Sequence, residues 1–183
     1  MNKNFIFTTT IVFVLSLFLG NAQNTPPIYL NPSVNVDDRV DDLMARMTLE
    51  EKVYQMNQFV GLDHMRQAEK DITDEELHSN DAQGFYKGLF SDDVAKMTRR
   101  GEIGSFLHVL TPEESNLLQD LAAQSRLKIP VLIGIDAIHG NALVSGSTVY
   151  PSPITLASTW SDDFLEVIGK QTAVEMRATG SHW

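Results

Sequence analysis

The sequence contains no cysteine and is short of positive charge, and each shortage excludes a class of site. Without cysteine, the chain can form neither a disulfide nor a thiolate metal centre. Its 14 Lys and Arg residues are outnumbered by 24 Asp and Glu residues, which gives a net charge of -10. The longest basic run is Arg99-Arg100, and phosphate binding needs clustered cations, so we expect no nucleic-acid partner. Hydrophobic residues make up 43% of the chain, which is typical of a globular protein rather than a disordered one.

Residues 1–22 have the three parts of a secretory signal peptide. Lys3 supplies the positive start, residues 5–19 are apolar except for three Thr and one Ser, and small residues precede Ala22. The alternative is a membrane anchor, but this apolar stretch is short for a span of about 20 residues. We therefore expect cleavage after Ala22, a secreted or periplasmic protein, and no membrane contact once the signal has been removed.

Two helices are predicted after a proline-containing linker at residues 23–33. The first begins near Val34 with Asn35 as its N-cap, and one face is apolar at helical spacing. That face consists of Val36, Val40, Leu43, Met44 and Met47. Residues 48–51 then form a capping box, in which Thr48 and Glu51 bond to each other's backbone amides. The second helix is predicted to follow, with Leu49, Val53, Met56 and Val60 on its inner face.

The stretch from residue 61 to 101 is charged and weakly periodic, so we interpret it as a solvated surface insertion of loop and short helix. A strand, a helix and a second strand are predicted over residues 103–135, which is the length of a βαβ crossover. The helix has a strong start at Thr111-Pro112-Glu113-Glu114. His108 falls inside the first of these strands, where a core or rim histidine is the ordinary interpretation.

The second of these strands, residues 129–135, is predicted to be buried on both faces, because its apolar residues are largely β-branched. Asp136 follows directly where this apolar run ends. Ligands of parallel α/β folds bind at the carboxyl ends of strands, so Asp136 is a candidate binding or catalytic carboxylate. The alternative that the sequence leaves open is a carboxylate that caps the next turn.

The last third of the chain is predicted to contain a Gly-, Ser- and Pro-rich loop at residues 141–153 and a short strand at residues 154–159. A helix follows from the Ser161 cap to a stop at Gly180. Its inward residues are predicted to be Phe164, Leu165, Ile168, Thr172 and Met176. Residues 181–183 have the pattern of the start of another strand.

The polar residues that could carry chemistry are Asp136, His139, His108 and His182. Their spacing matches no metal-binding motif, no nucleophile elbow of a Ser-His-Asp triad is present, and no Gly-rich phosphate loop follows a strand. We therefore expect neither a metal nor another cofactor. A metal-dependent hydrolase stays a distant alternative because carboxylate and imidazole are both metal ligands.

At these residues the sequence resembles glycoside hydrolase family 3, the family of β-glucosidases and exo-glucanases. The resemblance lies in the order and spacing of short segments, and residues 61–100 depart from it. The matching segments are Arg46-Met47-Thr48-Leu49-Glu50-Glu51-Lys52-Val53, Gln55-Met56, Gly101-Glu102-Ile103-Gly104-Ser105, Gln124-Ser125-Arg126-Leu127-Lys128-Ile129-Pro130, Gly134-Ile135-Asp136-Ala137-Ile138-His139-Gly140, Tyr150-Pro151, Leu156-Ala157-Ser158-Thr159-Trp160 and Glu175-Met176-Arg177-Ala178-Thr179-Gly180.

The resemblance implies an α/β fold in which residues 34–183 are the N-terminal portion of a (β/α)8 TIM-type barrel, truncated here. It implies a retaining exo-acting β-glycosidase, most simply a β-glucosidase, acting on a β-linked oligosaccharide or glucoside. It also implies that Asp136 binds hydroxyls of the terminal sugar. The nucleophile and the acid/base carboxylate are expected beyond residue 183, so this stretch alone is expected to be inactive. The alternative is a secreted carbohydrate-binding or structural protein that keeps barrel pieces without catalysis.

Overall fold

A computed structural model describes residues 27–70, 73, 75, 86 and 88–183. The chain divides into two compact units at the boundary between Met47 and Thr48, and each is described by itself. The predicted signal peptide and residues 23–26 of the predicted linker lie outside the described residues, as does most of the stretch from 71 to 87. In the described part of the chain, no helix has the length and apolar character needed to cross a membrane.

The first unit pairs a short 3-10 helix, η1 (Ile28–Leu30), with helix α2 (Val36–Arg46). Asn35 caps α2 as predicted, since its side chain accepts a hydrogen bond from the amide of Asp37 at 2.8 Å. The Tyr29 amide donates to Asp42 Oδ2 at 3.1 Å, and Arg39 Nε donates to the Tyr29 carbonyl at 2.9 Å. Part of the predicted extended linker is therefore a structured turn held to α2.

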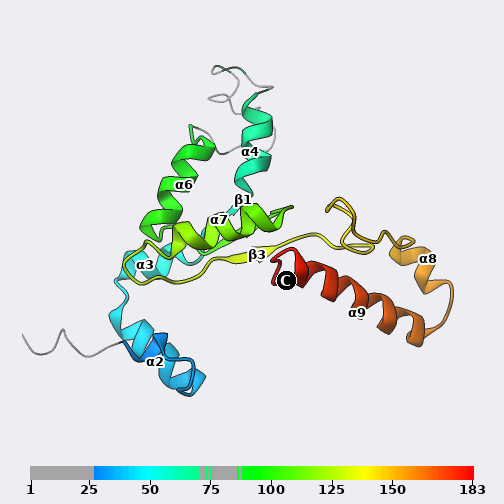
Figure 1. Ribbon diagram of the computed structural model, residues 1–183, viewed down its shortest axis with the longest axis horizontal. Helices are drawn as coiled ribbons and strands as arrows, with labels where there is room; N and C mark the ends of the chain where they lie inside the picture. The colour runs from blue at the N-terminus through cyan, green and yellow to red at the C-terminus, as the bar shows by residue number, and fades with distance from the viewer. Residues whose placement is uncertain (1–26, 71–72, 74, 76–85, 87) are drawn as a thin grey trace, which may run out of the picture. The chain divides into compact units, whose positions relative to one another are not determined.

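The second unit is built on a parallel sheet of three strands, in the order β1 (Gln58–Val60), β2 (Ser105–Leu107) and β3 (Leu132–Gly134) (Figure 1). Helix α4 (Leu62–Glu69) follows β1, and helix α6 (Ser91–Arg100) precedes β2. Helix α7 (Pro112–Ala122) connects β2 to β3. The α/β class and the predicted strand–helix–strand crossover within residues 103–135 are therefore confirmed.

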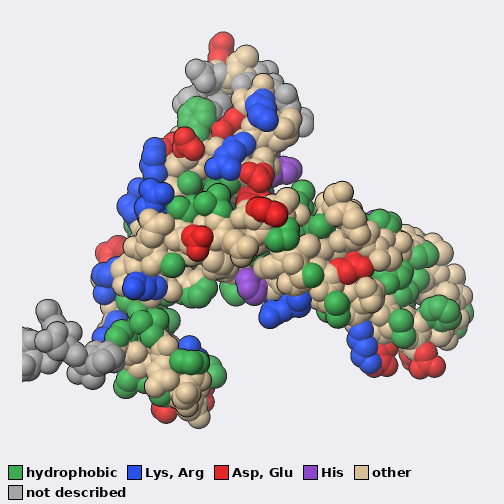
Figure 2. All heavy atoms as spheres, in the orientation of Figure 1, with side chains coloured by type: hydrophobic (Ala, Val, Ile, Leu, Met, Phe, Trp, Pro, Cys, Tyr) green, Lys and Arg blue, Asp and Glu red, His purple; other side chains and the backbone are tan. Residues whose placement is uncertain are grey.

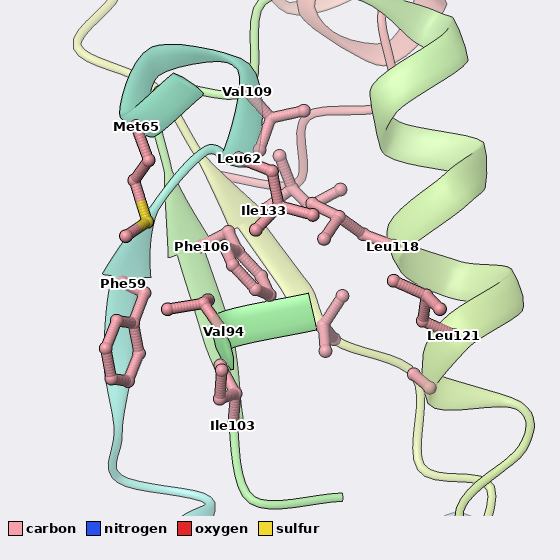
Figure 3. Close-up of a cluster of buried hydrophobic side chains, with 12 residues drawn as sticks. Phe59, Leu62, Met65, Val94, Ile103, Phe106, Val109, Leu118, Leu121 and Ile133 are labelled. Carbon is pink, nitrogen blue, oxygen red and sulfur yellow. The ribbon is translucent and has the colours of Figure 1, made fainter. Parts of the chain in front are cut away.

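The core of this unit lies between the sheet and its helices (Figure 3). The central row of the sheet aligns Phe59, Phe106 and Ile133, and all three side chains are buried. Leu118 and Leu121 of α7 point toward the strands, as Val94 of α6 does. The remaining core residues are Leu62, Met65, Ile103, Val109, Ala122 and Val131.

The prediction that the strand at residues 129–135 is buried on both faces is wrong for the described residues. Leu132 is 55% exposed, whereas its neighbour Ile133 is fully buried. Successive side chains of a strand point to opposite faces, so one face of β3 meets the core and the other carries an uncovered leucine. A near-continuous apolar run therefore does not show, in this strand, that both faces are covered by helices.

The second predicted helix is shorter than expected and gives way to a strand. Helix α3 (Leu49–Tyr54) has the predicted capping box, with Thr48 Oγ1 accepting from the Glu51 amide at 3.2 Å and Glu51 Oε2 accepting from the Thr48 amide at 2.9 Å. Glu51 also accepts from Arg126 Nε at 2.9 Å. Val60 lies in β1 rather than on a helix, and Leu49 is 74% exposed, so the predicted inner face is wrong.

The pairing of β1 with β2 explains this correction. The Asn57 carbonyl accepts from the amides of Gly104 and Ser105 at 3.1 and 3.2 Å, and Asn57 Nδ2 donates to the Glu102 carbonyl. A Cβ atom at Gly104 would lie 2.1 Å from the carbonyl oxygen of Gln55, so only glycine allows this approach. These partners are about 45 residues away along the chain, so local periodicity does not reveal them.

The predicted strand at residues 154–159 is also wrong, because helix α8 (Pro153–Ala157) occupies that stretch. Pro153 stands at the first helical turn, where its fixed φ favours a helix, and the Leu156 amide bonds to the Ser152 carbonyl. Helix α9 (Asp162–Ala178) follows, with the predicted Ser161 cap. Of its predicted inward residues, Thr172 is buried and Ile168 and Met176 are half-buried, whereas Phe164 and Leu165 are exposed.

Residues 181–183 run along the free edge of β3, as a further strand would. The His182 amide donates to the Ile133 carbonyl at 2.7 Å, and the Ile135 amide donates to the Trp183 carbonyl at 3.0 Å. The indole of Trp183 lies against Gly134, where a Cβ atom would come within 2.8 Å of its ring. Residues 181–183 are thus bonded to β3, but they are not a strand in this structure, and the sheet has three strands.

Candidate functional site

Three residues lie just beyond the carboxyl ends of β1, β2 and β3, and we call this side of the sheet its carboxyl edge. Gly61 follows β1, His108 follows β2, and Asp136 comes two residues after β3. Because the strands are parallel and in register, these residues lie at the same edge. This is the edge at which parallel α/β folds bind ligands.

His108 and Asp136 form a hydrogen-bonded pair at this edge. His108 Nε2 lies 3.0 Å from Asp136 Oδ2, and the two side chains are 27% and 58% exposed. An ionised carboxylate can only accept hydrogen bonds, so the hydrogen of this bond belongs to Nε2. The sequence singled out both residues, and the structure brings them together from the ends of neighbouring strands.

His108 is one residue beyond β2 rather than inside a strand, and its backbone is left-handed, with a φ of +58°. That conformation is uncommon for a residue with a Cβ atom. It is held from two sides, because the His108 amide donates to the Gly134 carbonyl at 2.9 Å and its own carbonyl lies against Gly61. A Cβ atom at Gly61 would lie only 2.8 Å from that carbonyl oxygen.

Glu114 is a buried carboxylate behind this edge, and sequence reasoning treated it only as a helix-terminal acid. It is 4% exposed, and its Oε1 accepts a hydrogen bond from the Asp63 amide at 2.9 Å. The Glu114 side chain therefore caps α4, whose own N-cap residue, Gly61, has no side chain to do so. Burial raises the pKa of Glu114 above its usual range. The signal available in the sequence was the glycine at position 61, which leaves the helix cap unfilled.

The other two candidate histidines hold backbone in place. His139 Nδ1 lies 3.1 Å from the Tyr150 carbonyl, and the Tyr150 amide donates back to the His139 carbonyl at 2.9 Å. His182 Nδ1 accepts a hydrogen bond from the Ile133 amide at 3.0 Å. The four-residue constellation is therefore one pair and two structural histidines. Among residues 27–70 and 88–183, no group of three His, Asp or Glu residues is arranged to hold a metal ion.

Comparison with known proteins identifies the family of the chain. The family model described as "Glycosyl hydrolase family 3 N terminal domain" matches residues 48–183, which is more than half of the chain. The chain belongs to glycosyl hydrolase family 3. The resemblance drawn from the sequence motifs is thereby confirmed, and the matched range begins where the second structural unit begins.

Individual relatives of this family 3 chain are named as β-glycosidases. It is 33% identical over 121 residues to a "Probable beta-glucosidase C" of Aspergillus flavus, which covers 66% of the chain and 18% of that protein. It is 27% identical over 146 residues to a "Periplasmic beta-glucosidase" of Salmonella typhimurium, covering 79% of the chain and 15% of that protein. A "Beta-xylosidase" of Formosa agariphila is 34% identical over 85 residues, covering 43% and 12%. The chain spans less than a fifth of the length of these relatives.

The family motif around Asp136 continues into a loop that is fastened to α9. Gly140 has a φ of +86°, and a Cβ atom there would lie 2.2 Å from the Thr148 carbonyl oxygen. Glu175 of α9 accepts from the Thr148 amide at 2.9 Å and from Thr148 Oγ1 at 2.7 Å. The Thr148 hydroxyl and amide hold the pKa of Glu175 below its usual range. The loop beside the candidate site therefore has a fixed course.

Proposed function

We propose that this family 3 chain is the N-terminal part of the barrel of a secreted, retaining, exo-acting β-glucosidase. The observation that carries the proposal is Asp136, an exposed carboxylate at the carboxyl end of β3 in a chain of this family. The names of the relatives support a β-glucoside substrate, and the β-xylosidase keeps β-xylosides as a second class to be tested. The signal-like residues 1–22 support secretion, as does the relative named periplasmic.

In the proposed enzyme, Asp136 holds two neighbouring hydroxyls of the terminal sugar. An ionised carboxylate has two oxygens and about four acceptor positions, so it can accept from two hydroxyls. Oδ2 already accepts from His108, and within the described residues Oδ1 carries no hydrogen bond. Oδ1 is therefore the oxygen open to the sugar, and Oδ2 keeps a second acceptor position.

The chemistry itself is assigned to later residues of the complete enzyme. A retaining mechanism needs two carboxyl groups about 5–5.5 Å apart, one as nucleophile and one as acid/base. We assign neither role to a residue of this chain. Relatives more than five times as long as the aligned stretch have room for both groups in segments that have no counterpart here.

The proposal is tested by assaying the complete enzyme that contains this chain. We expect hydrolysis of aryl β-glucosides faster than of aryl β-xylosides, and a first-formed β-anomer in the proton NMR spectrum. A first-formed α-anomer would contradict retention. Binding of glucosides without turnover would favour the carbohydrate-binding alternative. Absence of both binding and turnover would overturn the proposal.

The role of Asp136 is tested with two substitutions in the same enzyme. Hydrogen bonds to a charged group contribute about 1.5–3 kcal/mol each, so Asp136→Ala should lower kcat/KM by roughly two to four orders of magnitude. Asp136→Asn keeps the shape and loses the charge, so it should be impaired less. Both variants should keep the wild-type melting temperature. If Asp136 were only a turn cap, Asn would behave almost like wild type, and Ala would lower the melting temperature while kcat/KM stayed unchanged.

A further inference from the structure

We propose that His108 is a positioning residue that fixes the carboxylate of Asp136 so that Oδ1 faces the sugar. This inference rests on the proposed function, because it deepens the role of Asp136 as the sugar-binding carboxylate. It assigns to His108 no contact with the reacting atoms. The supporting observations are the hydrogen bond between the two side chains, the exposure of Asp136 and the backbone conformation of His108.

The first step of the argument is the freedom that Asp136 would have alone. Its side chain is 58% exposed, so contacts with neighbouring side chains leave it room to rotate. A binding group that samples several rotamers must be ordered when the ligand binds, and that ordering weakens affinity. The hydrogen bond from His108 Nε2 to Oδ2 at 3.0 Å removes this freedom before the sugar arrives.

The second step is the division of the two carboxylate oxygens. Nε2 carries the hydrogen of the bond because an ionised carboxylate only accepts. One oxygen is therefore tied to β2 through His108, and the other is presented at the edge of β3. The pair thus connects neighbouring strands, so the direction of Oδ1 is set by the register of the sheet.

The third step is the backbone of His108. A φ of +58° is uncommon outside glycine, although asparagine, aspartate and histidine adopt it more often than other residues. At His108 the bond to the Gly134 carbonyl and the close approach of Gly61 hold this conformation. Unfavourable backbone conformations gather at functional sites, where they aim a side chain. Here the side chain that is aimed is the imidazole, and its target is Asp136.

The experiment measures glucose binding by calorimetry and kcat/KM for an aryl β-glucoside in the complete enzyme. His108→Gly removes the ring while keeping the left-handed backbone without strain. Loss of a hydrogen bond to a charged group should weaken glucose binding and lower kcat/KM by about tenfold. The melting temperature should stay at or above the wild-type value. His108→Asn, which also tolerates this φ but is too short to reach Oδ2, should behave like His108→Gly.

Three controls separate positioning from other roles. In an Asp136→Ala background, His108→Gly should cause no further loss, because it acts through the carboxylate. Added imidazole should restore glucose binding to His108→Gly and should not restore it to Asp136→Ala. His64→Ala, at an exposed histidine of α4, should change neither binding nor kcat/KM.

Each contrary outcome has a separate meaning. Wild-type glucose binding in His108→Gly, with weakened binding in Asp136→Ala, would overturn the positioning role alone. An equal loss from His108→Gly with and without Asp136 would overturn it too, since the histidine would then act independently. A melting temperature that falls together with binding would assign His108 a structural role. Unchanged binding in Asp136→Ala would overturn the proposed function itself.

Discussion

The two halves of the second unit differ in how far their apolar side chains are buried. Residues 58–135 enclose a core in which Phe106, Leu118 and Ile133 are fully buried. Over α8 and α9, by contrast, apolar side chains gather on the surface in Figure 2. The exposed large apolar residues of this half include Ile154, Trp160, Phe164, Val167 and Val174. The first half closes its own core, whereas the second half is fixed by polar contacts such as the bonds from Thr148 to Glu175.

The comparison teaches that amphipathic patterning and burial are separate properties. Phe164, Val167 and Val174 lie at helical spacing on α9, as a core-facing stripe would. Their exposure shows that nothing within the described residues covers this stripe. In the first half the same kind of pattern on α7 meets a sheet, and its leucines are buried.

The largest expected effect comes from a matched pair of phenylalanine truncations. Phe106→Ala should lower the free energy of unfolding by about 3–5 kcal/mol, because it leaves a cavity in the core. Phe164→Ala should change it by less than about 0.5 kcal/mol, because that side chain is 64% exposed. Urea unfolding of the purified protein measures both. A large loss at Phe164 would break the comparison and show that its face is covered in the assembled protein.

A matched pair of glycines should give effects of opposite sign. Gly104→Ala places a methyl group 2.1 Å from the Gln55 carbonyl oxygen, so it should destabilise the protein by about 1–3 kcal/mol. Gly169 lies inside α9 with open space where its Cβ would be. Gly169→Ala should therefore stabilise the protein by about 0.5–1 kcal/mol through helix propensity. Melting temperatures test the pair, and a destabilised Gly169→Ala would contradict an open α9 surface.

The smallest effect concerns two glutamates whose pKa values move in opposite directions. Burial raises the pKa of Glu114 above its ordinary value of 4.5, so its contribution to stability is present below that value and falls as pH rises through the raised pKa. Bonds from Thr148 lower the pKa of Glu175, so its contribution is present above 4.5 and is lost as pH falls through the lowered pKa.

Glutamine at each position should remove the corresponding pH dependence. Relative to wild type, Glu114→Gln should gain stability as pH rises above 4.5, because the amide stays neutral and still accepts from the Asp63 amide. Glu175→Gln should lose stability relative to wild type as pH rises from the lowered pKa of Glu175 toward 4.5, since it lacks the charge that Thr148 stabilises. Urea unfolding at a series of pH values measures both differences. If the free energy of unfolding of a variant and of wild type changed with pH in parallel, the assigned pKa direction would be contradicted.

Local signals in the sequence predicted the features that depend on local chemistry. The caps at Asn35, Thr48 and Ser161 were visible because a helix start needs particular side chains at fixed spacing. The βαβ crossover was visible from apolar periodicity, and the position of Asp136 followed from where an apolar run ends. These features need no information about distant residues.

The features that were missed depend on partners far along the chain. Residues 58–60 form a strand because β2 is available to pair with them, which the residues around Val60 do not encode. The left-handed backbone of His108 depends on Gly134 and Gly61, and the burial of Glu114 depends on the unfilled cap of α4. The pairing of His108 with Asp136 required the strand order, which only the structure supplies.

Glu51 has two roles at the end of the sheet opposite Asp136, where the strands begin. One carboxylate both caps α3 and binds Arg126, in the turn that leads into β3, so the amino edge is fastened by groups remote from Asp136. In barrel enzymes, residues at this edge serve stability, whereas the carboxyl edge serves chemistry. Substitutions around Glu51 are therefore expected to change stability without moving Asp136. The loops after the strands, which carry His108 and Asp136, can vary in sequence while the contacts of Glu51 stay in place.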